Sequence, residues 1–187
     1  DHGRDAYPLG RPRVMEGERV QLRPMQASDT EDVIRMRQEP SVLAQLFSDK
    51  APAREEHLRW LERTQVQGDR QEFIIVQRST GRSIGTIGLS NIHPKHRHAQ
   101  YGILIGEIDA RGKGLALEAS RLLLAHAFDK LGLHRVYLHV FPENAHALGL
   151  YEKAGFKQEG ILRQHVFKGG RFRDVAVMAM IHTEKCD

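Results

Sequence analysis

The stretch that decides the fold is Arg111-Gly112-Lys113-Gly114-Leu115-Ala116, which lies between a strand-like run from 101 to 105 and a helix-like run from 117 to 131. A glycine-rich turn from a strand into a helix leaves backbone N–H groups free at the helix N-terminus, where the helix dipole helps them bind phosphate. Glycines let the backbone approach a bulky anion, and Arg111 and Lys113 add positive charge. The stretch therefore predicts a site for a phosphorylated ligand.

The pattern in this stretch is Arg-x-x-Gly-x-Ala, which differs from two familiar phosphate motifs. It is not a GxxxxGK[ST] loop, and the residues after Gly114 do not complete a GxGxxG fingerprint. Six residues are a short motif, so an ordinary glycine-containing helix entry stays open as the alternative.

A second block, about thirty residues further on, runs from Glu143 to Phe156 and has the pattern of one short helix. Asn144 is a good N-cap, and Gly155 is the expected C-cap residue. The positions between them that fall on one helical face are Ala147, Leu150, Tyr151 and Ala154.

Together, the two blocks resemble the GNAT superfamily of acyl-CoA-dependent N-acetyltransferases. The family's Gln/Arg-x-x-Gly-x-Gly/Ala loop for the CoA pyrophosphate is met by Arg111, Gly114 and Ala116. Its Asn and Leu-Tyr-Glu-x-x-Gly-Phe block is met by Asn144 and by residues 150–156. Either motif alone is weak, whereas both in this order and spacing are specific. The resemblance extends from about residue 20 to residue 181.

The resemblance implies acetyl-CoA as cosubstrate, with no metal. It places the acyl chain along the strand before the loop, against the main chain of Leu104, Ile105 and Gly106, where two parallel strands separate. Further expected CoA-binding residues are Arg111, Gly112, Lys113, Gly114, Leu115, Ala116, Asn144 and Lys153. Asn144 can serve as a helix cap and also contact the pantetheine, and Lys153 is either a phosphate ligand or a solvated helix charge.

Tyr151 is the expected catalytic residue, because the family places a tyrosine here to protonate the departing thiolate. A phenol stays neutral at pH 7 and can donate a proton. The alternative is a core aromatic side chain.

The general base is left unassigned. Relatives often carry Glu where this chain has Gln100, and an amide cannot take a proton. Glu107 and a water chain remain candidates. The clustered His93, His96 and His98 lack a Cys or a suitably spaced carboxylate, so we interpret them as a loop rather than as a metal site.

Hydrophobic patterning along the chain predicts strands at about 20–23, 73–77, 83–92, 99–105, 135–140, 158–167 and 172–181. Helices are expected at about 28–37, beginning at a capping box from Ser28 to Glu31 and broken by Pro40, and also at 53–65, 117–131 and 144–154. This order predicts an α+β (mixed α/β) fold with a twisted, mostly antiparallel sheet, a central βαβ acyl-CoA-binding core and helices on both faces.

The chain has 187 residues, which fits one domain, expected at 19–187 after a poorly ordered tail at 1–18. It has no apolar run long enough for a membrane helix. The single cysteine, Cys186, and the absence of such a helix suit a cytoplasmic protein. The net charge of +4 fits an anionic small molecule, and since the Lys and Arg residues are scattered we expect no nucleic-acid partner. A homodimer is one option for the assembly.

The acceptor is expected to be a small-molecule amine or a peptide N-terminus. The chain resembles the group that acetylates ribosomal-protein N-termini, spermidine and UDP-linked 4-amino sugars, and the region from Pro40 to His57 leans toward the amino-sugar enzymes. In the segment 51–70, four acidic residues are offset by four arginines, which favours an amino sugar nucleotide or a protein N-terminus over a polyamine. The alternatives are a polyamine acetyltransferase and a non-catalytic acyl-CoA-binding module.

Overall fold

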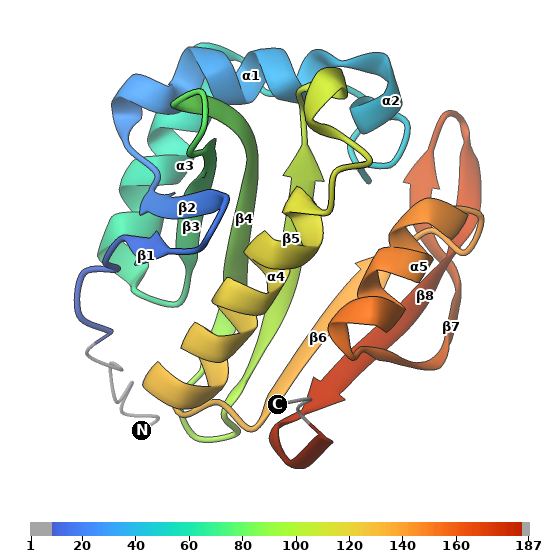
Figure 1. Cartoon of the computed structure of the whole chain (residues 1–187). Coiled ribbons are helices and arrows are strands. Elements are labelled where there is room, and N and C mark those ends of the chain that lie inside the picture. Colours follow the sequence, from blue (N-terminus) through green and yellow to red (C-terminus); the bar gives the residue numbers. More distant parts are fainter. Residues whose placement is uncertain (1–8, 185–187) are drawn as a thin grey trace.

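The computed structural model describes residues 9–184 of the chain, and Figure 1 shows their path. The longer helices are α1 (Thr30–Gln38), α3 (Arg54–Gln67), α4 (Leu115–Ala125) and α5 (Ala145–Ala154), and α2 (Pro40–Leu43) is a single turn. The strands are β1 (Met15–Glu16), β2 (Val20–Pro24), β3 (Gln71–Gln77), β4 (Arg82–His93), β5 (His98–Ile105), β6 (Arg135–Val140), β7 (Lys157–Lys168) and β8 (Arg171–Ile181). No helix within residues 9–184 is both long and apolar enough to span a membrane.

All eight strands form one sheet in the order β1-β2-β3-β4-β5-β6-β8-β7. Every neighbouring pair is antiparallel except β5 and β6, which are parallel and are joined through α4. The predicted fold class and its central βαβ unit are therefore confirmed. A parallel pair needs a long crossover connection, and α4 provides it.

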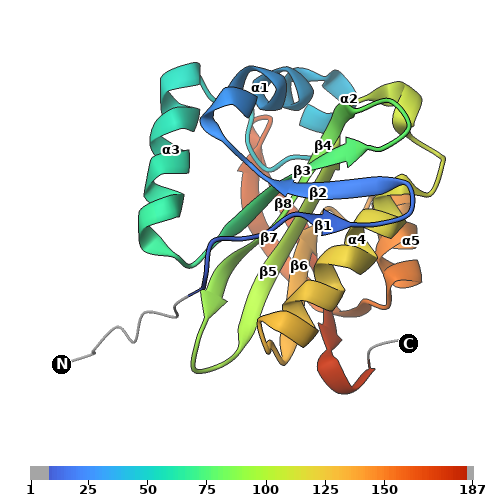
Figure 2. The ribbon, with the colours of Figure 1, turned by 60° about the vertical axis from the view of Figure 1, so that its left-hand side comes forward.

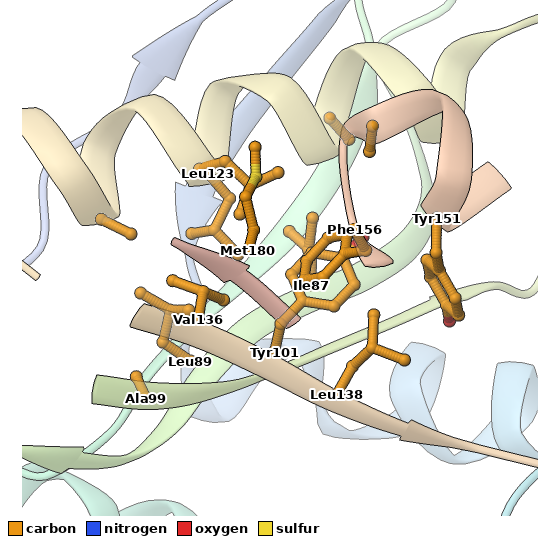
Figure 3. Close-up of a cluster of buried hydrophobic side chains, with 14 of the residues drawn as sticks. Ile87, Leu89, Ala99, Tyr101, Leu123, Val136, Leu138, Tyr151, Phe156 and Met180 are labelled. Carbon is orange, nitrogen blue, oxygen red and sulfur yellow. The ribbon is translucent and has the colours of Figure 1, made fainter. Parts of the chain in front are cut away.

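Helices cover both faces of the sheet. α4 and α5 lie on one face, and α1 and α3 lie on the other (Figure 2). The larger core lies under α4 and α5, where Leu123 of α4 and Phe156, just after α5, meet Tyr101, Leu138 and Met180 from the strands (Figure 3). On the opposite face, Val33 of α1 and Leu61 of α3 pack against Ile74 of β3. We call this second side the acceptor face, because the glycine loop that is expected to bind CoA begins α4 on the other side.

The parallel pair β5 and β6 is in register over only three residue pairs, from His98↔Arg135 to Gln100↔Tyr137. Beyond Gln100, β5 remains paired with β4 as far as Ile105, while β6 continues along β8. The second half of β5 is therefore open on its β6 side. This gap is the separation of parallel strands that the resemblance implied.

Several local predictions differ from the structure. The capping box forms two residues earlier, between Gln26 and Asp29, because Arg23 binds the buried Asp29 carboxylate at 2.7 and 2.9 Å and fixes it there. Pro40 does not simply end a helix but begins α2, where a missing N–H costs nothing. The helix after the glycine loop starts at Leu115 and ends in a π-turn, 126–130.

The predicted boundary of the N-terminal tail, at residue 18, also differs from the structure. Part of the expected tail forms the edge strand β1, whose Met15 is paired with Leu22. Residues 1–8, together with Cys186, lie outside the described residues.

Candidate active site

The glycine loop enters α4 through two left-handed residues. Gly112 has φ of 73° and Gly114, the N-cap of α4, has φ of 76°, a region that L-residues with a side chain rarely adopt. Leu115 is buried in the core and fixes the first turn of the helix, while Gly112, Lys113 and Gly114 are exposed. The first N–H groups of α4 have no intrahelical acceptor, so this end is suited to hold a phosphate group.

The cations at this loop come from several segments. Arg19, which precedes β2, donates from Nη1 to the Lys113 carbonyl at 2.6 Å. Arg19, Arg78 and Lys113 line a surface cavity of about 570 Å³ together with Leu115. Sequence reasoning missed Arg19 and Arg78, because nothing in the chain order places them beside residue 113.

Arg111, which is expected to bind the CoA phosphate, is hydrogen-bonded to other parts of the protein. Its guanidinium donates to the Ile105 carbonyl at 2.9 and 3.2 Å and to Ser41 Oγ at 2.7 Å. It therefore ties the end of β5 to α2 and holds the start of the loop in place. Its role toward CoA remains a prediction.

Glu118, in the first turn of α4, fixes β2 to the loop. Its carboxylate accepts from the backbone N–H groups of Arg19 and Val20, each at 2.8 Å, and from Arg19 Nε at 3.3 Å. Burial alone would raise the pKa of Glu118, but these hydrogen bonds favour the charged form and the net effect is a lowered pKa.

The three residues expected to contact the acyl chain lie at the open end of β5. Gly106 donates its N–H to the Ile84 carbonyl on the β4 side at 2.9 Å, so Ile105, one residue earlier, directs its N–H to the gap, while its carbonyl accepts from Arg111. Leu104 packs under Met36 of α1, and a Cβ at position 106 would collide with the same methionine. This close approach of α1 accounts for a glycine at 106.

Tyr151 lies on α5 and its ring points toward the sheet near Tyr101 and Phe156 (Figure 3). It is 8% exposed, and burial raises its pKa to about 12. The phenol therefore keeps its proton at pH 7. Tyr151 is part of the core, as the alternative reading held, and its hydroxyl remains a candidate proton donor.

The other two predicted CoA-binding residues of the second block, Asn144 and Lys153, lie at the two ends of α5. Asn144 is the N-cap of α5 and its Oδ1 accepts from the Ala147 N–H at 3.2 Å, so the capping prediction is confirmed. Lys153 is exposed in the last turn of α5. Contact of either residue with CoA stays a prediction.

On the acceptor face, the middle of the central strand is bare. Gly102 of β5 is exposed, and nothing lies within 4 Å of where its Cβ would be. It pairs with Gly88 of β4, which pairs in turn with Glu72 of β3. We call these two glycines the glycine floor. An uncovered position in a central strand, beside the gap between β5 and β6, leaves room for an acceptor.

The two side chains considered for the base from the sequence, Gln100 (excluded as an amide) and Glu107, are both engaged. Gln100 accepts from Asn91 Nδ2 at 3.3 Å, and an amide cannot take a proton. Glu107 lies beyond the end of β5 and is held between Arg35 at 2.6 Å and Arg82 at 3.1 Å. The carboxylate nearest the glycine floor is Glu72, which the sequence did not single out.

The side of the acceptor face near β6 is closed by the β7–β8 hairpin. Lys168 Nζ donates to the carbonyls of Leu43 (2.5 Å), at the end of α2, and of Leu46 and Ser48 (3.1 Å), in the segment after it. The hairpin tip thereby approaches α2 (Figure 1), and Phe141 packs on Phe47 with ring centroids 4.9 Å apart. The face is therefore bounded by α1, α2 and this hairpin.

The histidines between β4 and β5 pack on one another. The rings of His93 and His96 are stacked with centroids 4.3 Å apart, and His93 Nδ1 accepts from the His96 N–H. Over the described part of the chain, no group of three or more His, Cys, Asp or Glu side chains is placed to hold a metal ion.

Comparison with known proteins places these features in a family. Residues 19–157 match the model of the acetyltransferase (GNAT) domain. The chain is 29% identical to the spermidine N(1)-acetyltransferase of Vibrio cholerae over 163 residues, covering 87% of this chain and 93% of the relative. It is 32% identical to the spermidine N(1)-acetyltransferase of Escherichia coli K12 over 161 residues, covering 86% and 85%.

Solved structures agree. The Vibrio cholerae spermidine N-acetyltransferase in complex with CoA and spermine superimposes with a TM-score of 0.83 at 27% identity, covering 90% of this chain and 98% of that one. A GCN5-related N-acetyltransferase from Brucella melitensis superimposes with a TM-score of 0.77 at 28% identity, covering 94% of this chain and 82% of that one. The strand gap, the left-handed glycines and the free N-terminus of α4 fit CoA. This chain therefore belongs to the GNAT acetyltransferase family and is an N-acetyltransferase that uses acetyl-CoA.

Proposed function

We propose that the acceptor is a polyamine of the spermidine class, acetylated on a primary amine. The observation that carries this proposal is the similarity to spermidine N(1)-acetyltransferases over nearly the whole chain, 29% over 163 residues for the Vibrio cholerae enzyme. This departs from the sequence-based preference for an amino sugar nucleotide or a protein N-terminus, which the comparisons support less well.

The argument that favoured those acceptors also loses its basis. It relied on the balance of charges in the segment 51–70, but Glu55, Glu56, Arg59 and Glu62 point to solvent from α3. Of this segment, Arg70 reaches the acceptor face, where it pairs with Glu72 of β3. The Glu72 carboxylate is an anionic group that suits a cationic amine.

One observation keeps the amino sugar nucleotide as a second candidate. The Nε of Arg37, on α1, is buried without a hydrogen-bond partner among residues 9–184, and burial lowers the pKa of this guanidinium. A buried donor without an acceptor is unfavourable, so a ligand oxygen is a natural partner for it. An acceptor that carries phosphate would supply such an oxygen, whereas a polyamine would not.

Thiol release from acetyl-CoA separates the two candidates. The purified chain is assayed with spermidine, with a UDP-linked 4-amino sugar and with an alanine-initiated peptide, each over a range of concentrations. The proposal expects kcat/KM for spermidine near the usual enzyme range, about 10⁴ M⁻¹s⁻¹ or above. A sugar nucleotide or peptide that is used at least tenfold better than spermidine would refute it.

The chain is also proposed to assemble through the edge of its sheet. Ile161, Phe167 and Phe172 of the β7–β8 hairpin are 43%, 58% and 63% exposed, an unusual exposure for large apolar side chains. A structure of the Vibrio cholerae relative is described as dodecameric. Light scattering after gel filtration tests for a dimer or a larger assembly, and a monomer at micromolar concentration would contradict it.

A further inference from the structure

The glycine floor has a carboxylate at one end. Glu72 pairs with Gly88, and a Cβ at position 88 would collide with Glu72 Oε2, so the side chain extends across the empty position toward β5. Neighbouring strands lie about 4.8 Å apart, so the Glu72 backbone is about 10 Å from Gly102, and the side chain spans roughly half of that distance. The carboxylate therefore covers Gly88, the pairing partner of Gly102, and lies more than 4 Å from the Cβ position of Gly102.

The opposite end of the floor is the gap where the thioester is expected. The parallel register of β5 and β6 ends at Gln100↔Tyr137, and its continuation would place His139 level with Gly102. Ile105, on the same strand, directs its N–H toward this gap, while its carbonyl accepts from Arg111. An amine that reaches the gap from the acceptor face lies between Glu72 and the open edge of β5.

The two oxygens of Glu72 differ in their surroundings. Arg70 Nη1 donates to Oε1 at 2.8 Å and orients the group. Among the residues that the structure describes, no donor hydrogen-bonds to Oε2, which is the oxygen over Gly88. The Glu72 side chain as a whole is 15% exposed, so the carboxylate is largely buried but still reaches the surface.

We propose that the Glu72 carboxylate is the general base that takes a proton from the acceptor amine during acetyl transfer. The inference rests on the transfer of an acetyl group to an amine, and it is independent of the choice of a polyamine. The family resemblance points to position 100, and the sequence leaves Glu107 and a water chain as candidates. Neither Gln100 nor Glu107 offers a free carboxylate at the floor.

Protons and charges balance over the proposed acetyl transfer. The acceptor enters as an ammonium ion, R–NH3⁺, and one of its protons moves to Glu72. The neutral nitrogen bonds to the acetyl carbon, the carbon–sulfur bond breaks, and loss of a second nitrogen proton balances the proton that the departing thiolate takes up. The products are R–NH–CO–CH3, CoA–SH and protonated Glu72, which returns its proton to water.

The electrostatic setting suits this role. Burial raises the pKa of Glu72 to about 7, while Arg70 and, more weakly, Arg37 of α1 favour its charged form. A base whose pKa lies near the working pH gives the best compromise between ionised population and proton affinity. A titratable group on the far side of the gap is His139 of β6, whose pKa is lowered by burial and by His165.

Glu72→Gln is the test variant, because the amide keeps the size of the side chain and an acceptor for Arg70. Gln resembles the protonated acid, and a carboxyl with a raised pKa is penalised when it ionises, so we expect the variant to be at least as stable as the parent above pH 7. Glu159→Gln is the matched control, because it removes another arginine-paired carboxylate, that of the Arg135–Glu159 pair between β6 and β7.

Steady-state kinetics are measured between pH 6 and 10 with acetyl-CoA and spermidine or, if the panel selects another amine, with that amine. The parent should show kcat/KM rising through about pH 7 and then levelling, because Glu72 must be ionised. In Glu72→Gln, kcat/KM should be roughly 100-fold lower at pH 7.5, which is within the usual contribution of a general base. It should then keep rising with pH up to the pKa of the acceptor amine. Affinity for acetyl-CoA by calorimetry should be unchanged, and Glu159→Gln should stay within twofold of the parent.

A rescue and a direct titration complete the test. Gln100 lies on the same face of β5, two residues from Gly102. Adding Gln100→Glu to Glu72→Gln should therefore raise kcat/KM at least tenfold above that of Glu72→Gln alone. Carbon-13 NMR of glutamate-labelled protein should show one carboxyl titrating near pH 7 that disappears in Glu72→Gln.

Three outcomes would overturn the proposal. The first is a kcat/KM for Glu72→Gln within threefold of the parent with the same pH profile. The second is a loss of rate that is matched by a loss of acetyl-CoA affinity or of folding, which would make Glu72 structural. The third is a rise through pH 7 that survives in Glu72→Gln and is abolished in His139→Asn, which would assign the proton to His139.

Discussion

Gly88 and Gly102 are paired directly across β4 and β5, so the two central strands carry no side chains at one level of the acceptor face. Gly88 is covered by Glu72, whereas Gly102 is exposed beside the gap between β5 and β6. Glycine is disfavoured in the interior of a strand, and its usual justification there is the close approach of a ligand or of another backbone. This pairing therefore brings the acceptor face next to the gap between β5 and β6, where the thioester of acetyl-CoA is expected.

The glycine loop should lose CoA when a carboxylate is added at its centre. Gly114→Glu places a negative charge and a side chain at the N-cap of α4, with φ of 76°, where phosphate is expected. We expect the affinity for CoA, measured by calorimetry, to fall at least tenfold, or about 1.4 kcal/mol. Gly68→Glu is the control, since Gly68 caps α3 at a similar φ of 69° with open space around it. Equal affinities in the two variants would place the phosphate elsewhere.

The hydroxyl of Tyr151 should matter to the rate and little to the fold. Tyr151→Phe keeps the ring that packs near Tyr101 and Phe156 and removes the proposed proton donor. We expect kcat and kcat/KM to fall together by about 10²–10⁴-fold, with acetyl-CoA affinity retained.

Tyr101→Phe is the matched control for that variant. Its hydroxyl is hydrogen-bonded to Ser120 Oγ at 2.6 Å in the core, so its loss should lower the stability by about 1 kcal/mol and leave kcat within twofold. A Tyr151→Phe enzyme with kcat within twofold of its parent would remove the phenol from the mechanism.

The Glu118 carboxylate should make the stability of the chain depend on pH. Its folded-state pKa is lowered, so its contribution is present above the ordinary glutamate pKa of 4.5 and is lost as the pH falls through the folded value. Glu118→Gln should therefore lower Tm at pH 7, and the difference from the parent should shrink on acidification. Thermal unfolding followed by circular dichroism checks this, and a Tm difference that stayed constant from pH 7 to pH 3 would disagree.

Arg37 should discriminate between the two candidate acceptors. Its guanidinium is close enough to Glu72 for each to affect the other's pKa. Arg37→Gln removes a cation from the acceptor face, so KM for spermidine should fall, whereas KM for a sugar nucleotide should rise by about tenfold or more if a phosphate pairs with Arg37. Arg59→Gln, on the exposed side of α3, is the control for a general change in net charge. Unaltered KM values for both acceptors would show that Arg37 contacts neither.

Much of the fold could be predicted from the chain because the signals are local. The strand at 135–140 has the predicted bounds, Asn144 caps α5 as expected, and the glycine loop turns from β5 into α4. The alternation of apolar residues and the position of the capping residues depend on near neighbours in sequence. These same elements hold the predicted CoA-binding residues.

The acceptor face could not be predicted, because it depends on register between strands that are far apart in sequence. Glu72 looks like an ordinary strand residue until its pairing with Gly88, and that of Gly88 with Gly102, is known. Arg19 likewise reaches the loop only because Glu118 binds its backbone N–H. Distant contacts of this kind leave no periodic signal in the sequence. The capping box shifted for a more local reason, since Arg23 of β2 binds the Asp29 carboxylate only six residues later.

The measurement that tests the central claim most directly is turnover in Gly102→Leu. The position is exposed, has open space around it and does not need a left-handed backbone, so leucine should fill the glycine floor without disturbing the sheet. Gly160→Leu, at an equally open position of β7, is the control. If amine and thioester meet at Gly102, thiol release with the best acceptor should fall at least 100-fold in Gly102→Leu and stay within twofold in Gly160→Leu, with CoA binding kept in both. Full turnover in a folded Gly102→Leu variant would contradict the account.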